Sequence, residues 1–245
     1  MENSTSKAVF GYNMNDIKIL SIIPARSGSK GIIEKNIIDL FGKPLLVGSI
    51  EASLKSQYVS KTVVSSDSKK ILDIASRFKA DTLLRPEELA KDTSSSEEVI
   101  KHTLQELSNE IKFYDYLVLL QPTSPLRDSK DIDNAFEKLI NSDATALISV
   151  FQEDNKILKA FKENDNGYLQ GISNNKYPFT PRQELPPVYM SNGAIYIIKI
   201  TEFLKNDKLF TDKTVFYEMP KERSLDIDTI EDMEKIKSYM ETTKK

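Results

Sequence analysis

The chain has 245 residues, of which 39% are hydrophobic and 29% are charged, enough for one large domain with a sizeable core. Its formal net charge of −3 disfavours nucleic acid and anionic membranes as partners and leaves small ligands open. The absence of cysteine excludes a disulfide framework, a thiol nucleophile and a cysteine metal site. No apolar run approaches the ~18 residues of a membrane span, and residues 1–16 form a polar tail unlike a secretory signal, so we expect a cytoplasmic protein.

Predicted strands and helices alternate up to residue 150. Apolar runs predict strands, and apolar residues three and four apart predict helices. The predicted strands cover residues 18–23, 61–66, 82–84, 116–120 and 145–150, and the predicted helices begin at Pro44 or span about 71–78, 96–108 and 130–140. This alternation indicates an α/β fold with a mostly parallel, Rossmann-like sheet and helices on both faces.

The pattern changes after this alternating part. Residues 151–190 show no clean helical spacing and contain four prolines, so we predict that they leave the sheet as an inserted hairpin and loops. Strands predicted near 194–199 and 223–227 return the chain to the sheet, and a final helix follows. We therefore expect a single domain over residues 17–245.

The loop after the first predicted strand combines glycine with positive charge. Its glycines are Gly28 and Gly31, and its cations are Arg26, Lys30 and Lys35. Glycines let backbone N–H groups approach an anion, and open α/β sheets bind ligands at the carboxyl ends of their strands. The loop therefore predicts a polyphosphate site. It matches neither GxxxxGK[ST] nor GxGxxG, so a solvated basic turn is the alternative.

Two carboxylates near the carboxyl end of the chain suggest a metal site. Asp226 and Asp228 are two residues apart, and on a strand they share one face while Leu225 and Ile227 take the other. Two carboxylates together with triphosphate oxygens would suit Mg²⁺. The alternative for Asp228 is a helix N-cap that forms a capping box with Glu231.

Six segments together resemble one enzyme family. They are PARSGSKGIIEKN (24–36), LLRPEELAKDTSSS (83–96), LQPTSPLR (120–127), PRQELP (181–186), SNGAIY (191–196) and SLDIDT (224–229). In this order they resemble the motifs of sugar-acid cytidylyltransferases, in particular the CMP-sialic acid synthetases and their relatives for other nonulosonic acids. The resemblance implies a Mg²⁺-dependent enzyme that turns CTP and a nonulosonic acid into a CMP-sugar acid and pyrophosphate. It also implies a homodimer in which residues 151–190 pack on the second subunit and help to close the sugar site.

The resemblance assigns a nucleotide site and a metal site. Arg26 and Lys30 would bind the phosphates and, with Asp226, would carry catalysis, because fixed cations stabilise the departing pyrophosphate. The metal ligands would be Asp226 and Asp228. The full set of nucleotide ligands would be Arg26, Lys30, Lys35, Asn36, Arg85, Ser94 and Ser96, of which the last three would read cytosine. The alternative for this serine run is a helix cap, at Thr93 or a nearby serine.

The resemblance also assigns a sugar site. Its candidate residues are Gln121, Lys159, Arg182, Asn192 and Tyr196. Arg182 suits the carboxylate of the sugar acid, because a guanidinium forms a bidentate fork with such a group. The segment around Gln121 could instead be only a proline-fixed turn, and Tyr196 could be a core residue.

The identity of the sugar acid is open at this stage. Met190 stands where many sialic acid enzymes have a second arginine, which indicates another nonulosonic acid, such as legionaminic or pseudaminic acid. Two alternative functions remain. One is a cytidylyltransferase for 3-deoxy-manno-octulosonate, and the other is a non-catalytic CTP-binding regulator on the same fold.

Overall fold

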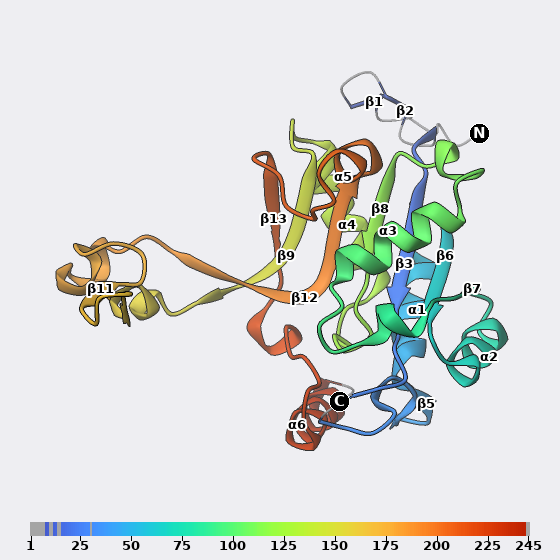
Figure 1. Ribbon diagram of the computed structural model, residues 1–245, viewed down its shortest axis with the longest axis horizontal. Coiled ribbons are helices and arrows are strands. Elements are labelled where there is room, and N and C mark those ends of the chain that lie inside the picture. The colour runs from blue at the N-terminus through green and yellow to red at the C-terminus, as the bar shows by residue number, and fades with distance from the viewer. Residues whose placement is uncertain (1–7, 10–11, 14–15, 30, 244–245) are drawn as a thin grey trace.

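The computed structural model describes residues 8–9, 12–13, 16–29 and 31–243, and its centre is a seven-stranded sheet (Figure 1). In spatial order the strands are β13 (Thr214–Glu218), β9 (Ala146–Glu153), β12 (Val188–Lys199), β8 (Tyr116–Leu119), β3 (Ile19–Pro24), β6 (Val59–Ser66) and β7 (Asp81–Leu84). Two-stranded pairs are formed by β1 (Ala8–Val9) with β2 (Tyr12–Asn13), and by β4 (Asp39–Leu40) with β5 (Lys43–Pro44). The strands predicted before residue 151 are confirmed, with boundaries shifted by at most a few residues.

The main sheet is mostly parallel, as predicted, with one reversed strand. β3 pairs parallel with β6 and β8, β6 pairs parallel with β7, and β13 pairs parallel with β9. β12 is antiparallel to both of its neighbours, β8 and β9. The strand predicted near 223–227 is wrong, because the last strand of the sheet is β13. The backbone N–H of Ile227 donates instead to the carbonyl oxygen of Thr123, in the loop after β8, at 2.9 Å.

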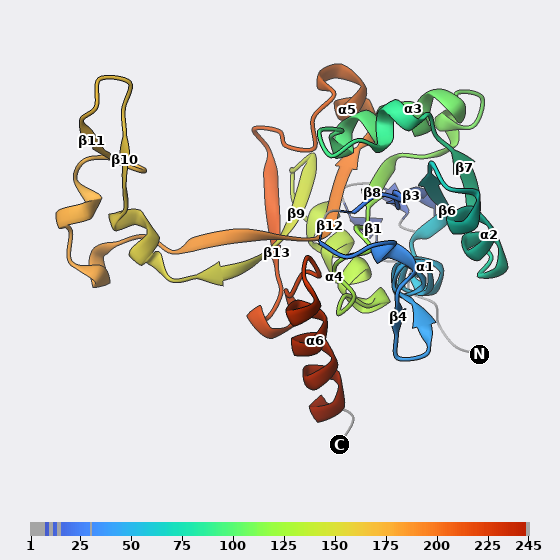
Figure 2. The same ribbon diagram turned by 60° about the horizontal axis from the view of Figure 1, so that its bottom comes forward.

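Helices cover both faces of the sheet (Figure 2). On one face lie α1 (Leu45–Lys55), α2 (Lys69–Arg77) and α4 (Ser129–Ile140), and on the other lie α3 (Ser96–Glu106) and α5 (Ile200–Asn206). The last helix, α6 (Ile230–Thr243), stands below the carboxyl edge of the sheet. Among the described helices, none combines the length and the apolar composition that crossing a bilayer requires.

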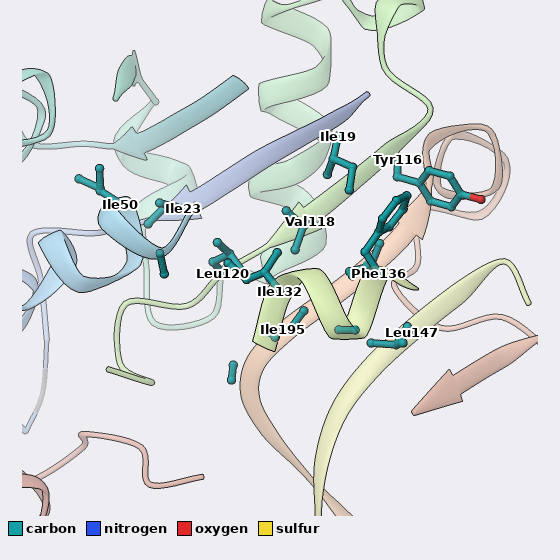
Figure 3. Close-up of a cluster of buried hydrophobic side chains, with 14 of the residues drawn as sticks. Ile19, Ile23, Ile50, Tyr116, Val118, Leu120, Ile132, Phe136, Leu147 and Ile195 are labelled. Carbon is teal, nitrogen blue, oxygen red and sulfur yellow. The ribbon is translucent and has the colours of Figure 1, made fainter. Parts of the chain in front are cut away.

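The core follows from the two-residue period of the central strand. Along β3, Ile19 and Ile23 pack on the side of α1 and α4, while Leu20 and Ile22 pack on the side of α3 and α5. All four are fully buried, as expected for a parallel strand that is covered on both faces. Figure 3 shows the first cluster, in which Phe136 of α4 lies edge-on against the ring of Tyr116 with centroids 5.3 Å apart.

A long ribbon carries the chain away from the sheet. β9 and β12 stay paired beyond the sheet, from Ser191 opposite Val150 to Val188 opposite Glu153. The ribbon ends in the small hairpin of β10 (Phe161–Glu163) and β11 (Leu169–Gly171), which Figures 1 and 2 show projecting far from the sheet. We call residues 151–190 the arm. The structure describes the whole arm, and it contains short 3₁₀ turns but no α-helix, as its sequence predicted.

Candidate active site

A cavity of about 210 Å³ opens at the carboxyl ends of β3 and β8. Three segments line it: residues from the loop after β3, residues between β7 and the first turn of α3, and the start of the loop after β8. Parallel strands bring such loops to one edge of a sheet, so segments far apart in the sequence meet there. The cavity lining includes these predicted site residues: Arg26, Lys35, Asn36, Arg85, Ser94, Ser96 and Gln121.

Arg26 presents its guanidinium to the cavity. The Nη1 atom lies 2.6 Å from Oδ1 of Asp92, which lines the cavity from the segment before α3. About one third of the Arg26 side chain is exposed, so the guanidinium remains accessible from solvent. The ion pair holds the Arg26 guanidinium against the Asp92 side of the cavity.

Hydrogen bonds hold the loop that carries Arg26. The buried side chain of Asn36 donates through Nδ2 to the carbonyl oxygen of Arg26 at 2.8 Å. The backbone N–H of Ser27 donates to Oδ1 of Asp67 at 2.9 Å, and the Ser27 hydroxyl donates to the same carboxylate. Asp67 follows β6 and does not line the cavity, so the loop after β6 supports the Arg26 loop from outside the cavity.

Lys35 joins this loop to the segment that carries Asp226 and Asp228, residues 224–229, which we call the acidic segment. Its ammonium donates to the carbonyl oxygen of Ile227 at 2.7 Å and to Oδ1 of Asp228 at 3.0 Å. A Cβ atom at Gly31 would overlap the carbonyl oxygen of Asp228, so glycine is needed there for close approach. Lys30 lies outside the described residues, and its predicted phosphate contact stays a prediction.

Arg85 is buried beside the cavity. Burial lowers its pKa, and the nearby charge of Asp67 opposes this change. Its Nε has no hydrogen-bond partner among the described residues, so a donor remains available on the side chain. The alternative of a serine cap is confirmed at Ser95, which forms a capping box with Glu98 at the start of α3. Ser94 donates through its hydroxyl to the carbonyl oxygen of Glu88 at 2.9 Å.

Gln121 is fixed by a buried arginine that the sequence analysis missed. Arg127 donates through Nη1 to the carbonyl oxygens of Gln121 at 3.3 Å and Ala194 at 2.9 Å. Burial lowers the pKa of Arg127 to about 10, and the negative charges of Asp131 and Asp128 oppose this change. Gly193 has a φ of +72°, and a Cβ there would clash with the side-chain oxygen of Gln121. The sequence did contain a signal for this residue, because Arg127 is the cation at the end of the run LQPTSPLR.

Asn192 and Tyr196 do not line the cavity. Asn192 is buried, its Oδ1 accepts from the Ser149 hydroxyl at 2.6 Å, and its Nδ2 donates to the Ser224 hydroxyl at 2.9 Å. The Tyr196 ring packs against the second core cluster, and its hydroxyl lies 2.8 Å from that of Ser191. The structure therefore places both residues in supporting positions and favours the core interpretation of Tyr196.

Asp226 and Asp228 lie beside the cavity on an irregular segment. Buried and exposed side chains alternate here as predicted, although no strand forms: Ile227 is fully buried and both aspartates are exposed. Although Asp226 as a residue is exposed, its carboxyl group is partly desolvated. This desolvation raises its pKa, a hydrogen bond with the Thr123 side chain opposes the rise, and the charge of Asp228 adds to it. Because Thr123 lines the cavity, the carboxylates stand at its rim.

The alternative interpretation of Asp228 as a helix cap is wrong. The capping hydrogen bonds at the start of α6 run between Thr229 and Asp232, one residue later than the predicted pair. Asp228 accepts from Lys35 instead. Asp228 does not cap α6 because Thr229 takes that role. The Thr229 hydroxyl accepts from the backbone N–H of Asp232 and donates to its carboxylate.

The two carboxylates suit a magnesium ion that is shared with phosphate. Within the described ranges, no cluster of three or more histidine, aspartate or glutamate side chains could hold a metal. Asp226 and Asp228 are close enough for their charges to interact, and carboxylate oxygens are preferred ligands of Mg²⁺. Mg²⁺ commonly takes one or two protein carboxylates and completes its shell with water and substrate phosphates. The donor set therefore fits Mg²⁺.

Lys159 and Arg182 lie on the arm, away from this cavity. Lys159 ends the 3₁₀ turn η5 (Asn155–Lys159), and Arg182 opens η7 (Arg182–Glu184). The exposed Arg182 guanidinium lies 3.3 Å from Oδ1 of Asp154 and borders a separate groove of about 420 Å³. Within one chain, the structure does not bring Arg182 together with Gln121.

Comparison with known proteins gives a consistent result. A family model described as "Cytidylyltransferase" matches residues 20–243. The N-acylneuraminate cytidylyltransferase of Escherichia coli O18:K1:H7 is 39% identical over 89% of this chain, which spans only 51% of that protein. The pseudaminic acid cytidylyltransferase of Campylobacter jejuni is 33% identical over 89% of this chain and 94% of its own length. The CMP-N,N'-diacetyllegionaminic acid synthase of Legionella pneumophila is 32% identical over 81% of this chain and 85% of its own length.

A solved structure shows the same fold. CMP:2-keto-3-deoxy-manno-octonic acid synthetase, complexed with CTP, matches with a TM-score of 0.69 over 92% of this chain and 99% of that chain. The two sequences are 15% identical, so this likeness concerns the arrangement of the elements alone.

Proposed function

Because the chain belongs to the cytidylyltransferase family, we propose that it transfers CMP from CTP to a nonulosonic acid and releases pyrophosphate. The observation that carries the proposal is the single cavity lined by Arg26, Arg85 and Gln121, with Asp226 and Asp228 at its rim. Each of these side chains has a distinct task in the transfer, and together they provide for base, phosphates and metal.

The cations of the loop after β3 bind the phosphates. Arg26 meets the β- and γ-phosphates, where negative charge accumulates as pyrophosphate leaves. Lys35 is almost buried and is anchored on Ile227, so it adds a fixed positive charge near the carboxylates. Fixed charges need no reorganisation during the reaction, which is why they stabilise the transition state effectively.

The other end of the cavity binds the cytosine base. The Nε of Arg85 is a buried donor without a partner among the described residues, and leaving it unpaired is unfavourable. A pyrimidine oxygen would satisfy it. Ser94 and Ser96 line the same part of the cavity and add hydroxyl groups.

The chemical step needs no covalent intermediate. The anomeric C2 hydroxyl of the sugar acid attacks the α-phosphorus in line, and pyrophosphate departs toward Arg26. Gln121, held by Arg127 and Gly193, orients the sugar acid at the open side of the cavity. Asp226 and Asp228 would hold Mg²⁺, which when bound neutralises phosphate charge and lowers the pKa of a coordinated hydroxyl.

The sugar site is completed by a second subunit. Arg182 and Lys159 are suited to the carboxylate of the sugar acid but lie on an arm that reaches away from their own cavity (Figure 1). The arm exposes large apolar side chains that a partner would cover, which include Phe161, Leu169 and Phe179. A homodimer in which each arm closes the other subunit's cavity would use both features.

The substrate is a nonulosonic acid other than N-acetylneuraminate. Met190 is exposed at the base of the arm and provides no charge for a second contact with a carboxylate. We propose legionaminic or pseudaminic acid.

Pyrophosphate release tests the proposed function. The purified protein is mixed with CTP, Mg²⁺ and, in turn, N-acetylneuraminic, legionaminic, pseudaminic and 3-deoxy-manno-octulosonic acids. We expect fast release with legionaminic or pseudaminic acid, and little or none with N-acetylneuraminic or 3-deoxy-manno-octulosonic acid. Silence with every acid, combined with thermal stabilisation by CTP, would instead support the non-catalytic alternative.

A further inference from the structure

The segment that carries the two site carboxylates has no secondary structure of its own. Residues 224–229 lie between the 3₁₀ turn η8 (Lys221–Arg223) and α6, and they belong to no strand. The positions of Asp226 and Asp228 must therefore be fixed by tertiary contacts. Arg223 stands directly before it.

Arg223 forms a forked ion pair with a carboxylate on α4. Its Nη2 lies 2.5 Å from Oδ2 of Asp131, and its Nη1 lies 3.1 Å from Oδ1. The Asp131 side chain is only 5% exposed, so the pair is largely shielded from water. Two parallel charge-assisted hydrogen bonds fix both distance and orientation, which a single contact does not.

Asp131 is itself held rigidly. It occupies the third position of α4 and forms a capping box with Asp128, in which its Oδ2 accepts from the Asp128 backbone N–H at 2.9 Å. The hydroxyl of Tyr217 on β13 donates to its Oδ1 at 3.2 Å. The carboxylate that receives Arg223 is therefore tied to the start of one helix and to one strand of the main sheet.

The acidic segment is bound to the loop after β8 through Arg223, directly before it, and through Ile227, between its two aspartates. Arg223 donates through Nη2 to the carbonyl oxygen of Leu126 at 2.9 Å. The N–H of Ile227 donates to the carbonyl oxygen of Thr123, whose side chain bonds Asp226. This loop begins with Gln121 in the cavity lining. The Arg223–Asp131 pair thus fixes the acidic segment relative to the cavity.

We propose that Arg223 and Asp131 form a positioning pair that sets where Asp226 and Asp228 present their carboxylates to a metal–triphosphate complex. This inference rests on the proposed function of the same cavity. Neither member of the pair lines the cavity, so neither touches the nucleotide. Their effect passes through the placement of the two metal ligands, as is common for residues that support metal ligands from behind.

The test separates metal binding from nucleotide binding and from stability. Without a sugar acid CTP is not consumed, so calorimetry measures the affinity for CTP alone and then the affinity of the CTP-loaded protein for Mn²⁺. Arg223→Lys keeps the charge and removes the fork. We expect roughly 10- to 100-fold weaker Mn²⁺ binding with an unchanged affinity for CTP alone, and a matching rise in the Mg²⁺ concentration needed for half-maximal turnover.

A matched control comes from the same 3₁₀ turn. Lys221 pairs with Glu153 at 2.8 Å on the surface, so Lys221→Gln removes an ion pair from η8 without touching the positioning pair. Its Mn²⁺ affinity should equal that of the wild type. Tyr217→Phe removes one hydrogen bond to Asp131 and no charge, and it should give a smaller loss in the same direction even if Arg223→Lys folds poorly.

Two results would overturn the inference. One is Mn²⁺ affinity equal to wild type in Arg223→Lys and in Tyr217→Phe, with only the unfolding temperature lowered, since the pair would then be purely structural. The other is a wild-type protein that binds CTP but no Mn²⁺. A wild-type protein that binds no CTP would instead remove the proposed function, and the inference with it.

Discussion

The cavity and the arm differ in how much of a site one chain builds. The cavity gathers Arg26, Arg85 and Gln121 from distant parts of the sequence, and hydrogen bonds to the backbone carbonyl oxygens of Arg26 and Gln121 hold these two in place. The arm presents Arg182 to solvent, beside a single aspartate and exposed apolar side chains. On the proposed function, one chain would hold CTP, whereas the sugar half of the site would depend on a second copy. Variants in the two regions should therefore fail in different ways.

The largest effect is expected at the metal site. Asp226→Asn removes one of the two carboxylates that would hold Mg²⁺. Because a bound metal stabilises transition-state charge by several kcal/mol, turnover should fall by about 10²- to 10³-fold. CTP binding without metal should persist, because Asp226 does not line the cavity. Initial rates of pyrophosphate release measure the loss. Glu231→Gln, an exposed carboxylate nearby on α6, is the matched control and should keep wild-type turnover.

Arg26→Ala should reduce turnover by about 10²-fold, because it removes a fixed charge from the departing pyrophosphate. Lys70→Ala is the control, since Lys70 pairs with Glu34 of the same loop at 2.8 Å but does not line the cavity. Steady-state kinetics with saturating sugar acid compare the two variants. An unchanged kcat in Arg26→Ala would remove this residue from the mechanism.

In the arm, Arg182→Ala should act on the sugar acid alone. A charge-assisted contact is worth about 1.5–3 kcal/mol, so KM for the sugar acid should rise roughly 10- to 100-fold. The affinity for CTP should not change, because Arg182 lies outside the cavity. A parallel rise in KM for CTP would show that the two regions are not separate.

Mixing two variants whose activity is lost at a low sugar-acid concentration tests whether the arm serves a second copy. Gln121→Ala damages the cavity and Arg182→Ala damages the arm. In a dimer with exchanged arms, a mixed pair contains one site with both residues intact, so activity should reappear when the two proteins are unfolded and refolded together. Activity that stays at the level of the separate variants would place cavity and arm in the same chain's site.

A smaller effect is expected where the cavity loop meets the acidic segment. Gly31→Ala places a methyl group against the Asp228 carbonyl oxygen, and relieving such overpacking costs about 1–3 kcal/mol of unfolding free energy. Gly28→Ala is the control, because a Cβ there meets nothing within 4 Å. Urea unfolding of both variants measures the difference. Equal midpoints would show that the loop moves at little cost.

The sequence predicted the cavity better than the segments that support it. Arg26 and Gln121 directly follow buried strands, so the position of each was fixed by a pattern that apolar periodicity reveals. The alternation of Leu225 and Ile227 suggested a strand, but these side chains pack with α6 rather than in the sheet. Alternation records which side of a segment is buried and not what buries it.

Contacts between distant residues were beyond prediction. Arg223 and Asp131 are 92 residues apart, and neither stands in a motif that indicates a partner. Asn192 was assigned to the sugar because its motif resembles the family's, whereas the structure uses its amide inside the protein. A motif therefore identified the neighbourhood of the site without distinguishing residues that touch a ligand from those that hold the backbone.

The smallest effect should come from Met190, in the paired strands at the base of the arm. Met190→Arg adds a cation on the exposed side of β12, opposite Phe151. An exposed charge contact is worth up to about 1 kcal/mol, so kcat/KM for N-acetylneuraminate should rise only a few-fold relative to legionaminic or pseudaminic acid. Met190→Gln, which adds polarity without charge, should leave the ratio unchanged. A shift of equal size in both variants would mean that side-chain polarity or shape, and not charge, selects the sugar at this position.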